Sequence, residues 1–279
     1  MFADDTNLFF SGKHILKLQG EANTALKKLQ EWFNANRLTL NVEKTCFSIF
    51  TNSKSKNDVK LYLNQNEITR VYVTKYLGMY LDESLSWTQH VEYVINKIVQ
   101  LKGAFYYLSN ILNKECYNQI YYAYVFPYIK YGIEVYGACN TTLMNRLQRE
   151  QNKIIKTLYH KDRQYSTDQL YSELKLLKCS DIHKLFVGIF VYKHQNDMLP
   201  GIFNDYYNLN SVISIRLTRQ SNDLHIPLCR TKGGQRSIKY IGAKLWNELD
   251  NEVKSCPKLN MFKDSYRRLL IDLYEHHNV

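Results

Sequence analysis

The feature that most constrains the fold is a change in the spacing of apolar residues near residue 82. Before this point, short apolar runs alternate with turn-forming residues, a pattern typical of strands mixed with an occasional helix. After it, apolar residues recur every three or four positions over long stretches, as on a helix with one buried face. The sequence therefore predicts an α+β chain whose first third is mixed and whose remainder is mainly helical.

The first third contains one clear amphipathic helix among several strand candidates. Apolar residues repeat at helical spacing over 15–33. The strand candidates are the two arms of 2–10 with a tight turn between them, 46–50, the hairpin arms 60–63 and 67–73, and 76–81. Trp32, Leu38 and Leu40 are interpreted as core residues, because aromatic and aliphatic side chains at such positions usually pack.

Helical periodicity dominates after Ser84. The expected helices cover 87–112, 116–125 with an interruption at Pro127, about 142–158, about 180–194 and 261–274. The last eighty residues are otherwise less periodic.

The charge balance favours a polyanionic partner. The chain has 37 Lys and Arg against 26 Asp and Glu, a net charge of +11, and a basic surface attracts nucleic acid or an anionic membrane. No apolar run approaches the ~20 residues of a spanning helix, and Asp4 and Asp5 stand where a targeting segment would be apolar. Nucleic acid is therefore preferred, with no membrane partner. The 23 tyrosines suit packing and also base stacking.

The six cysteines are widely scattered, which excludes a zinc or redox motif of closely spaced cysteines. We interpret them as reduced thiols of an intracellular protein, nuclear or cytoplasmic. His276 and His277 have no cysteine partners nearby in sequence, so a metal role for them is not expected.

Asp4 and Asp5 form the sharpest chemical signal. Two adjacent carboxylates in the turn of an apolar hairpin could hold a hard divalent cation such as Mg²⁺. A pair of such ions can orient an attacking hydroxyl and stabilise a leaving pyrophosphate. The alternative is ordinary turn chemistry, since Asp, Thr and Asn all favour turns.

Several sequence blocks, taken in order, resemble one known family. The blocks are FADDTNLFF (2–10), LQEWFNANRLTLNVEKTCFSIF (29–50), KYLGMYLDESLSWTQHV (75–91), FPYIKYGIEVYG (126–137), LMNRLQREQNKIIK (143–156), RSIKYIGAKLWNELDNEVKS (236–255) and MFKDSYRRLL (261–270). They resemble the later palm motifs, thumb and C-terminal region of non-LTR, jockey-like reverse transcriptases. The resemblance implies a partial palm at 1–82 with a small mixed or antiparallel sheet, a helical thumb at 83–160, and a mostly helical C-terminal region at 161–279.

The resemblance also implies residue roles. Asp4 and Asp5 would contribute to binding two catalytic Mg²⁺ ions, and Lys44 would neutralise or protonate the pyrophosphate. Leu77 and Gly78 would form the turn that supports the primer, with the glycine allowing close backbone approach; alternatively, a glycine here marks a bulge. The implied partners are an RNA template and a DNA primer, and no small-molecule cofactor is expected beyond nucleotide and metal.

Two basic segments are candidates for nucleic-acid contact. Arg146, Arg149, Lys153 and Lys156 share one face of the expected 142–158 helix and could follow phosphates, or could simply be solvated. The second segment runs from residue 216 to 239, includes Arg230, Lys232 and Arg236, and contains Asp223 as its one acid.

The family chemistry also needs fingers and an earlier palm aspartate, which this sequence does not contain. We therefore expect a fragment of an RNA-directed DNA polymerase that is inactive by itself. The alternatives are a non-catalytic nucleic-acid-binding remnant, a relic that folds only in part, and, least favoured, a metal hydrolase built on Asp4 and Asp5.

Overall fold

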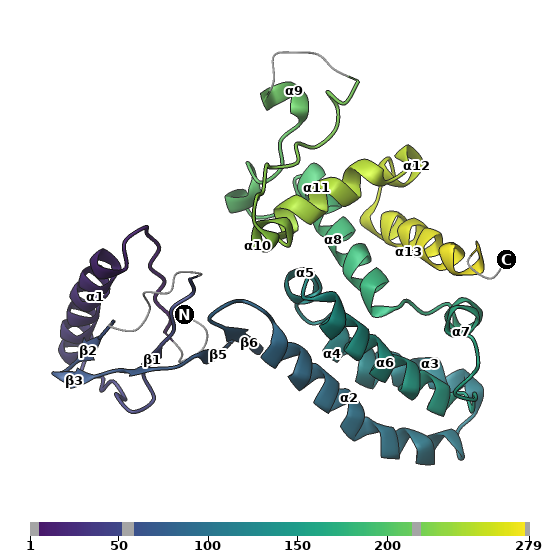
Figure 1. The fold of residues 1–279 in the computed structure, drawn as a ribbon, viewed down its shortest axis with the longest axis horizontal. Helices are drawn as coiled ribbons and strands as arrows, with labels where there is room; N and C mark the ends of the chain where they lie inside the picture. The colour runs from purple at the N-terminus through teal and green to yellow at the C-terminus, as the bar shows by residue number, and fades with distance from the viewer. Residues whose placement is uncertain (1–5, 52–58, 214–218, 277–279) are drawn as a thin grey trace. The chain divides into compact units, whose positions relative to one another are not determined.

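A computed structural model of the chain describes residues 6–51, 59–213 and 219–276 (Figure 1). The chain divides into two compact units, Met1–His90 and Val91–Val279. The first contains short strands and one long helix, and the second is helical. The expected α+β class is confirmed at this level.

The first unit combines a long helix with very short strands. Its elements are α1 (Ile15–Ala35), β1 (Cys46–Phe47), β2 (Tyr62–Leu63), β3 (Asn66–Glu67), β4 (Thr69–Arg70), β5 (Val73–Tyr76) and β6 (Met79–Asp82). They form three two-stranded sheets: β1 with β4 in parallel, β2 with β3 antiparallel, and β5 with β6 antiparallel.

Three strand predictions require correction. The described residues of the first hairpin, 6–10, have no regular structure, and its turn lies outside the described residues. The strand expected over 46–50 is only Cys46–Phe47. The strand expected over 76–81 is instead a hairpin, with Tyr76 paired to Met79. The chain reverses between them because Leu77 (φ 45°) and Gly78 (φ 80°) both adopt the left-handed conformation, which closes a two-residue hairpin loop.

The core of the first unit is small. Its buried cluster consists of Ala22, Leu61, Leu63 and Ile68, and the partly buried residues packed against it are Leu26, Leu40, Val42, Phe47 and Val59. The prediction of core positions was wrong for Trp32 and Leu38, whose exposed fractions are 55% and 49%. Trp32 lies about a quarter turn away from the line of Ala22 and Leu26 on α1, so the cluster does not reach it.

Asp82 organises the loop that leads into the second unit's first helix. Its carboxylate accepts hydrogen bonds from the Ser84 hydroxyl (2.6 Å), the Ser86 N–H (3.0 Å) and hydroxyl (3.1 Å), and the Trp87 N–H (2.9 Å). Burial opposes ionisation, but these bonds hold the pKa of Asp82 below its usual value. The same bonds stabilise a loop in which Leu85 and Trp87 have positive φ.

The second unit contains helices almost throughout. They are α2 (Thr88–Ser109), α3 (Lys114–Ile120), the π-helix Tyr121–Val125, α4 (Phe126–Lys130), α5 (Ile133–Tyr136), α6 (Thr141–Leu158), α7 (Thr167–Leu174), α8 (Cys179–Gln195), the 3₁₀ turn Gly201–Phe203, α9 (Asn210–Ile213), α10 (Lys232–Gln235), α11 (Ile238–Glu248), α12 (Asn251–Lys254) and α13 (Leu259–His276). The expected interruption at Pro127 is a change of helix type. Pro127 lies in the first turn of α4, where its missing N–H costs no hydrogen bond.

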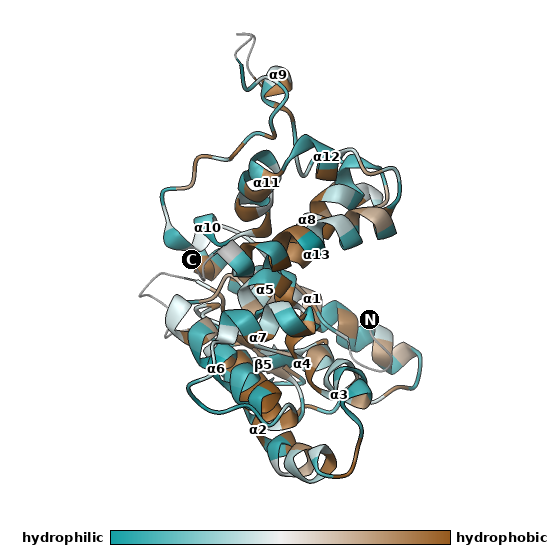
Figure 2. Cartoon of the chain, turned by 90° about the vertical axis from the view of Figure 1, so that its right-hand side faces the viewer, coloured by the Kyte–Doolittle hydropathy of each residue, from teal (hydrophilic) through white to brown (hydrophobic). Residues whose placement is uncertain are grey.

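The centre of the second unit is α8, which buries ten of its 17 residues. It packs against α5, α6, α11 and α13. Figure 2 colours much of α8 and α13 brown, for hydrophobic residues, where the two helices lie together. There the Tyr192 ring stacks on Phe262 with centroids 4.6 Å apart. The sequence prediction of these helices is confirmed, and the 180–194 helix begins and ends within one residue of α8.

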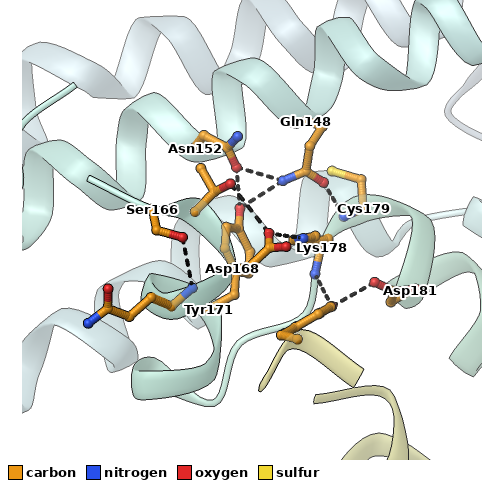
Figure 3. Close-up of polar contacts among 11 residues, drawn as sticks. Gln148, Asn152, Ser166, Asp168, Tyr171, Lys178, Cys179 and Asp181 are labelled. Atoms are coloured by element: carbon orange, nitrogen blue, oxygen red, sulfur yellow. Dashed lines mark hydrogen bonds and ion pairs between the residues drawn. The ribbon is translucent and has the colours of Figure 1, made fainter. Parts of the chain in front are cut away.

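A buried polar network joins α6, α7 and α8 (Figure 3). The Gln148 amide donates to Asn152 Oδ1 (2.7 Å) and to the Tyr171 hydroxyl (2.9 Å), and its oxygen accepts the Cys179 N–H (2.7 Å). Burial raises the pKa of Tyr171 and of Cys179, so both stay protonated. Since Tyr171 and Cys179 have no accessible surface and Gln148 is half-buried, we interpret this network as structural.

Candidate nucleic-acid interface

The outer face of α6 carries the expected cations. Asn140 caps this helix by accepting the Thr142 N–H, and the apolar residues Met144, Leu147, Ile154 and Leu158 face inward. Arg146, Arg149 and Lys153, three or four residues apart, therefore lie together on the exposed side. Lys156 differs from them. Its ammonium donates to the carbonyls of Arg163 and Tyr165, both at 2.7 Å, so it anchors the loop after α6.

The three exposed cations have different partners. Arg146 forms a bidentate ion pair with Glu92 of α2, and Lys153 pairs with Glu150 at 2.6 Å. Arg149 donates to the Asn145 carbonyl at 3.3 Å and has no carboxylate within ion-pair distance among the described residues. Arg149 is therefore the cation on this face that is most available to an anion.

A pair of exposed tyrosines on α2 was not anticipated from the sequence. Tyr106 and Tyr107 have exposed fractions of 63% and 67%. Apart from the adjacent backbone of α2 itself, no heavy atom lies within 4 Å of the position that a Cβ would take on Gly103. The periodicity of 87–112 correctly gave the buried face. The available signal was on the other face, where a glycine and two tyrosines occur in the C-terminal part of the helix.

Two contacts show that α2 and α6 run side by side in the same direction. Glu92 and Arg146 pair near their N-terminal ends, and the His160 ring hydrogen-bonds the Ser109 carbonyl at 3.0 Å near their C-terminal ends. Figure 1 shows the same arrangement.

The Glu92–Arg146 ion pair also shows which face of α2 and which face of α6 lie on the same side of the helix pair. On α2, Glu92 lies in line with Val99, Gly103 and Tyr106, which follow it by 7, 11 and 14 residues. On α6, Arg146 shares its face with Arg149 and Lys153. The exposed tyrosines of α2 and the exposed cations of α6 therefore lie on the same side of this helix pair. We call these residues (Gly103, Tyr106, Tyr107, Arg149 and Lys153) the α2–α6 surface.

The second basic segment lies around α10. Arg230, Lys232 and Arg236 are exposed, and Thr231 caps the short helix by accepting the Gly234 N–H at 3.1 Å. No described contact brings these side chains to the α2–α6 surface. They remain a separate prediction of nucleic-acid contact.

The predicted palm residues are also accounted for. Lys44 is exposed on a helical turn just before β1, and its N–H donates to Asn41 Oδ1 at 3.0 Å. Leu77 and Gly78 form the tip of the β5–β6 hairpin. No described contact joins Lys44 to this tip, so their proposed roles stay predictions.

The metal prediction falls outside the described residues, since Asp4 and Asp5 lie in the segment 1–5. Within 6–51, 59–213 and 219–276, no group of three or more His, Cys, Asp or Glu side chains is placed to hold a metal ion. Over the same ranges, none of the helices has the length and apolar character needed to cross a membrane.

Comparison with known proteins gives a consistent set of distant relatives. The RNA-directed DNA polymerase from mobile element jockey of Drosophila melanogaster is 25% identical over 183 residues, covering 64% of this chain and 20% of the relative. Its counterpart from Drosophila funebris is 25% identical over 187 residues, with the same coverage. The probable RNA-directed DNA polymerase from transposon X-element of Drosophila melanogaster is 23% identical over 160 residues, covering 55% of this chain and 17% of the relative.

The chain thus spans about a fifth of the length of the curated relatives it matches. No family model matches the chain. No solved structure matches it either. The three similarities relate this chain to the reverse transcriptases of jockey-like non-LTR retrotransposons.

Proposed function

We propose that this chain supplies a template–primer-binding part of an RNA-directed DNA polymerase of a mobile element. The observation that carries the proposal is the α2–α6 surface, on which exposed tyrosines and cations open on the same side. The relatives, which are named as RNA-directed DNA polymerases, make an RNA template paired with a DNA strand the favoured ligand.

The chemistry of the surface suits a nucleic-acid backbone. Arg149 and Lys153 are placed to contact successive phosphates and to release counterions as they do so. The open space over Gly103 admits close approach of a sugar or base edge, and Tyr106 and Tyr107 offer ring faces for stacking or apolar contact. None of these contacts requires a metal.

The catalytic part of the proposal rests on the sequence resemblance. In the complete polymerase reaction, the primer 3′ hydroxyl attacks the α-phosphate of the nucleotide and pyrophosphate leaves. Asp4 and Asp5 would supply carboxylates for Mg²⁺, Lys44 would contact the pyrophosphate, and Leu77–Gly78 would support the primer. We expect this chain alone to incorporate no nucleotide, and template-dependent incorporation in a primer-extension assay would contradict that expectation.

A non-catalytic nucleic-acid-binding role is the second candidate. It is favoured by the net charge of +11 and by the exposed cations of the α2–α6 surface. The two candidates share the α2–α6 surface. They differ in whether this region takes part in nucleotide incorporation by a complete polymerase, which primer extension by that polymerase measures.

Binding to a fluorescent RNA–DNA hybrid, followed by anisotropy over a salt series, tests the surface. The double variant Arg149→Gln, Lys153→Gln should bind about three- to tenfold more weakly at 0.1 M salt and with a shallower salt slope. Tyr106→Ala should weaken binding without changing that slope, because a ring contact releases no counterion.

Arg268→Gln is the matched control. Arg268 is exposed on α13, and its Nε donates to the Asp264 carbonyl at 3.3 Å, the same local contact that Arg149 makes on α6. Equal weakening by Arg149→Gln and Arg268→Gln would mean that the hybrid responds only to net charge, and the proposed surface would be wrong.

A further inference from the structure

A compact turn around α10 presents three cations to solvent. The Thr231 hydroxyl accepts the Gly234 N–H at 3.1 Å, and the Gln235 amide donates to the Cys229 carbonyl, also at 3.1 Å. These two bonds hold the backbone of residues 229–235 in one conformation. The exposed cations of this turn, which we call the α10 cations, are Arg230, Lys232 and Arg236.

The α10 cations have no acidic partners. In the part of the chain that the structure describes, no carboxylate lies within ion-pair distance of any of the three. In this respect they resemble Arg149, whereas Glu92 and Glu150 offset the charges of Arg146 and Lys153. A phosphate can therefore contact the α10 cations without first breaking an ion pair.

Arg236 lies close to the beginning of α6. Helix α10 packs on α11, and both α11 and α5 pack on α8. Figures 1 and 2, which differ by a quarter turn, both show α10 near α5, the short helix that precedes α6. Burial raises the pKa of the Cys139 thiol, which lies between α5 and α6, and the positive charge of Arg236 opposes this rise. Because a charge acts in this way only at short range, the Arg236 guanidinium lies near the connection between α5 and α6.

Helix α6 leads away from this connection with cations along its exposed face. Lys153 follows Cys139 by 14 residues, which is roughly 20 Å of helix at ~1.5 Å per residue. At ~3.4 Å per step of a duplex, that length corresponds to about six base pairs. A duplex that follows α6 from Lys153 towards the N-terminal end of this helix therefore approaches the α10 cations.

We propose that the α10 cations extend the α2–α6 surface, so that one RNA–DNA hybrid contacts both at the same time. This inference rests on the proposed function and enlarges the surface that binds its ligand. Contact with one set of cations holds the hybrid near the other, which raises the overall affinity above that of either set. The alternative is two separate sites, each of which holds its own hybrid.

The test measures how a hybrid of roughly 20 base pairs, about three times the length that α6 covers, binds to the full chain. The double variant Lys232→Gln, Arg236→Gln should bind it about three- to tenfold more weakly at 0.1 M salt. The salt slope should become shallower by about two, because two phosphate contacts are lost. Both side chains are exposed, so the variant should retain the circular dichroism of the parent.

Two controls separate this effect from net charge and from folding. The double variant Lys258→Gln, Arg268→Gln removes the same charge at α13, where both side chains are exposed, and should leave the slope close to that of the parent. Arg236→Lys keeps the charge and should also keep the parent slope. Equal effects of the two double variants, or an unchanged slope in Lys232→Gln, Arg236→Gln, would overturn the proposal.

Native mass spectrometry with excess hybrid distinguishes one surface from two sites. One hybrid per chain is expected, because a single duplex occupies both sets of cations. Two hybrids per chain, one of which is lost in Lys232→Gln, Arg236→Gln, would show that the sites are separate and would contradict the inference.

The same titrations separate this inference from the function on which it rests. If Arg149→Gln, Lys153→Gln weakens hybrid binding but the α10 double variant does not, only the extension of the surface fails. If neither double variant weakens binding more than the α13 control does, the proposed function fails. A loss confined to the α10 variant would also refute the proposed function, because the hybrid would then bind away from the α2–α6 surface.

Discussion

Helix α1 of the first unit and helix α8 of the second have the same kind of apolar spacing in the sequence, but they are buried to very different extents. Both were predicted from apolar spacing, and both formed within two residues of the expected bounds. Yet α8 buries ten of 17 residues, whereas α1 buries one of 21. Periodicity determines which face of a helix is apolar, but burial needs another element to cover that face. The first unit lacks such cover among the described residues.

The largest expected effect on stability comes from truncating a buried side chain in the core of the second unit. Phe262 is fully buried and touches Tyr192, Trp246 and Tyr266, so Phe262→Ala should lower the free energy of unfolding by about 3–5 kcal/mol. Urea denaturation followed by circular dichroism measures this loss.

Leu63→Ala in the first unit sharpens the comparison. Leu63 is also buried, but its small cluster can collapse around the gap, so the loss should be nearer ~2 kcal/mol. A loss equal to that of Phe262→Ala would mean that the first unit is as tightly packed as the second.

A pair of glycine substitutions should act in opposite directions. A Cβ on Gly137 would lie 2.4 Å from His183 Cδ2 and 2.5 Å from the Ile133 carbonyl oxygen, so Gly137→Ala should destabilise by about 1–3 kcal/mol. Gly103→Ala meets nothing within 4 Å and should stabilise α2 by up to ~1 kcal/mol. Thermal melts of both variants test this, and a stabilising Gly137→Ala would show that the α5–α8 contact is loose.

Among the described residues, each unit buries one histidine, which makes acid a test of both: His90, in the first turn of α2, is the last residue of the first unit, and His183 lies in the second. Burial lowers the pKa of His90 and of His183 to about 4, with the Lys184 charge contributing at His183. The unfolded imidazole titrates near 6.5. The stability from the neutral rings is therefore complete above about pH 6.5 and is lost progressively as the pH falls toward 4.

By pH 5, each histidine should cost about 1–2 kcal/mol relative to pH 7. His183→Gln should flatten the pH dependence of unfolding of the second unit, and His90→Gln that of the first. An unchanged pH profile in His183→Gln would locate the acid sensitivity elsewhere.

The smallest effect is expected at the β5–β6 turn. A leucine at φ 45° is strained relative to asparagine, which adopts left-handed geometry readily. Leu77→Asn should therefore raise the stability of the first unit by about 1 kcal/mol, measured as a rise in melting temperature. A fall would show that the Leu77 side chain contributes packing that outweighs the strain. Gly78→Ala, at φ 80°, should destabilise and serves as the opposite control.

The sequence could predict the long helices because their signal is local. Helices α1, α2, α6, α8 and α13 follow apolar spacing within one chain segment, and each was anticipated. The 76–81 strand was wrong because Gly78 is the one turn-forming residue in its apolar run and leucine rarely takes positive φ. The family resemblance, by contrast, had implied a turn at Leu77 and Gly78. Trp32 and Leu38 were placed in the core because residue type predicts burial only when a covering element exists. Helix α11 was missed, although Ser237 caps it by accepting the Tyr240 N–H.

The candidate interface was only partly predictable. The α6 cations follow from helical spacing, but their partners do not. That Lys156 is bound to two carbonyls while Arg149 stays available depends on the loop after α6 and on Glu150 and Glu92. Tyr106 and Gly103 join Arg149 on one side only because α2 and α6 pack in parallel, and no local pattern encodes that packing.

Because α13 lies at the end of the chain, it is synthesised well after α8, the helix that it covers. The Tyr274 hydroxyl donates to Asp181 at 2.6 Å, across 93 residues of sequence, and accepts the Lys178 N–H at 3.1 Å. At ~5–20 residues per second of synthesis, roughly 5–20 seconds separate the emergence of α8 from that of the helix that covers it. During that interval, the apolar surface of α8 is open to chaperones and to other nascent chains. Slower translation of the segment between the two helices would lengthen this exposure without changing a residue of the protein.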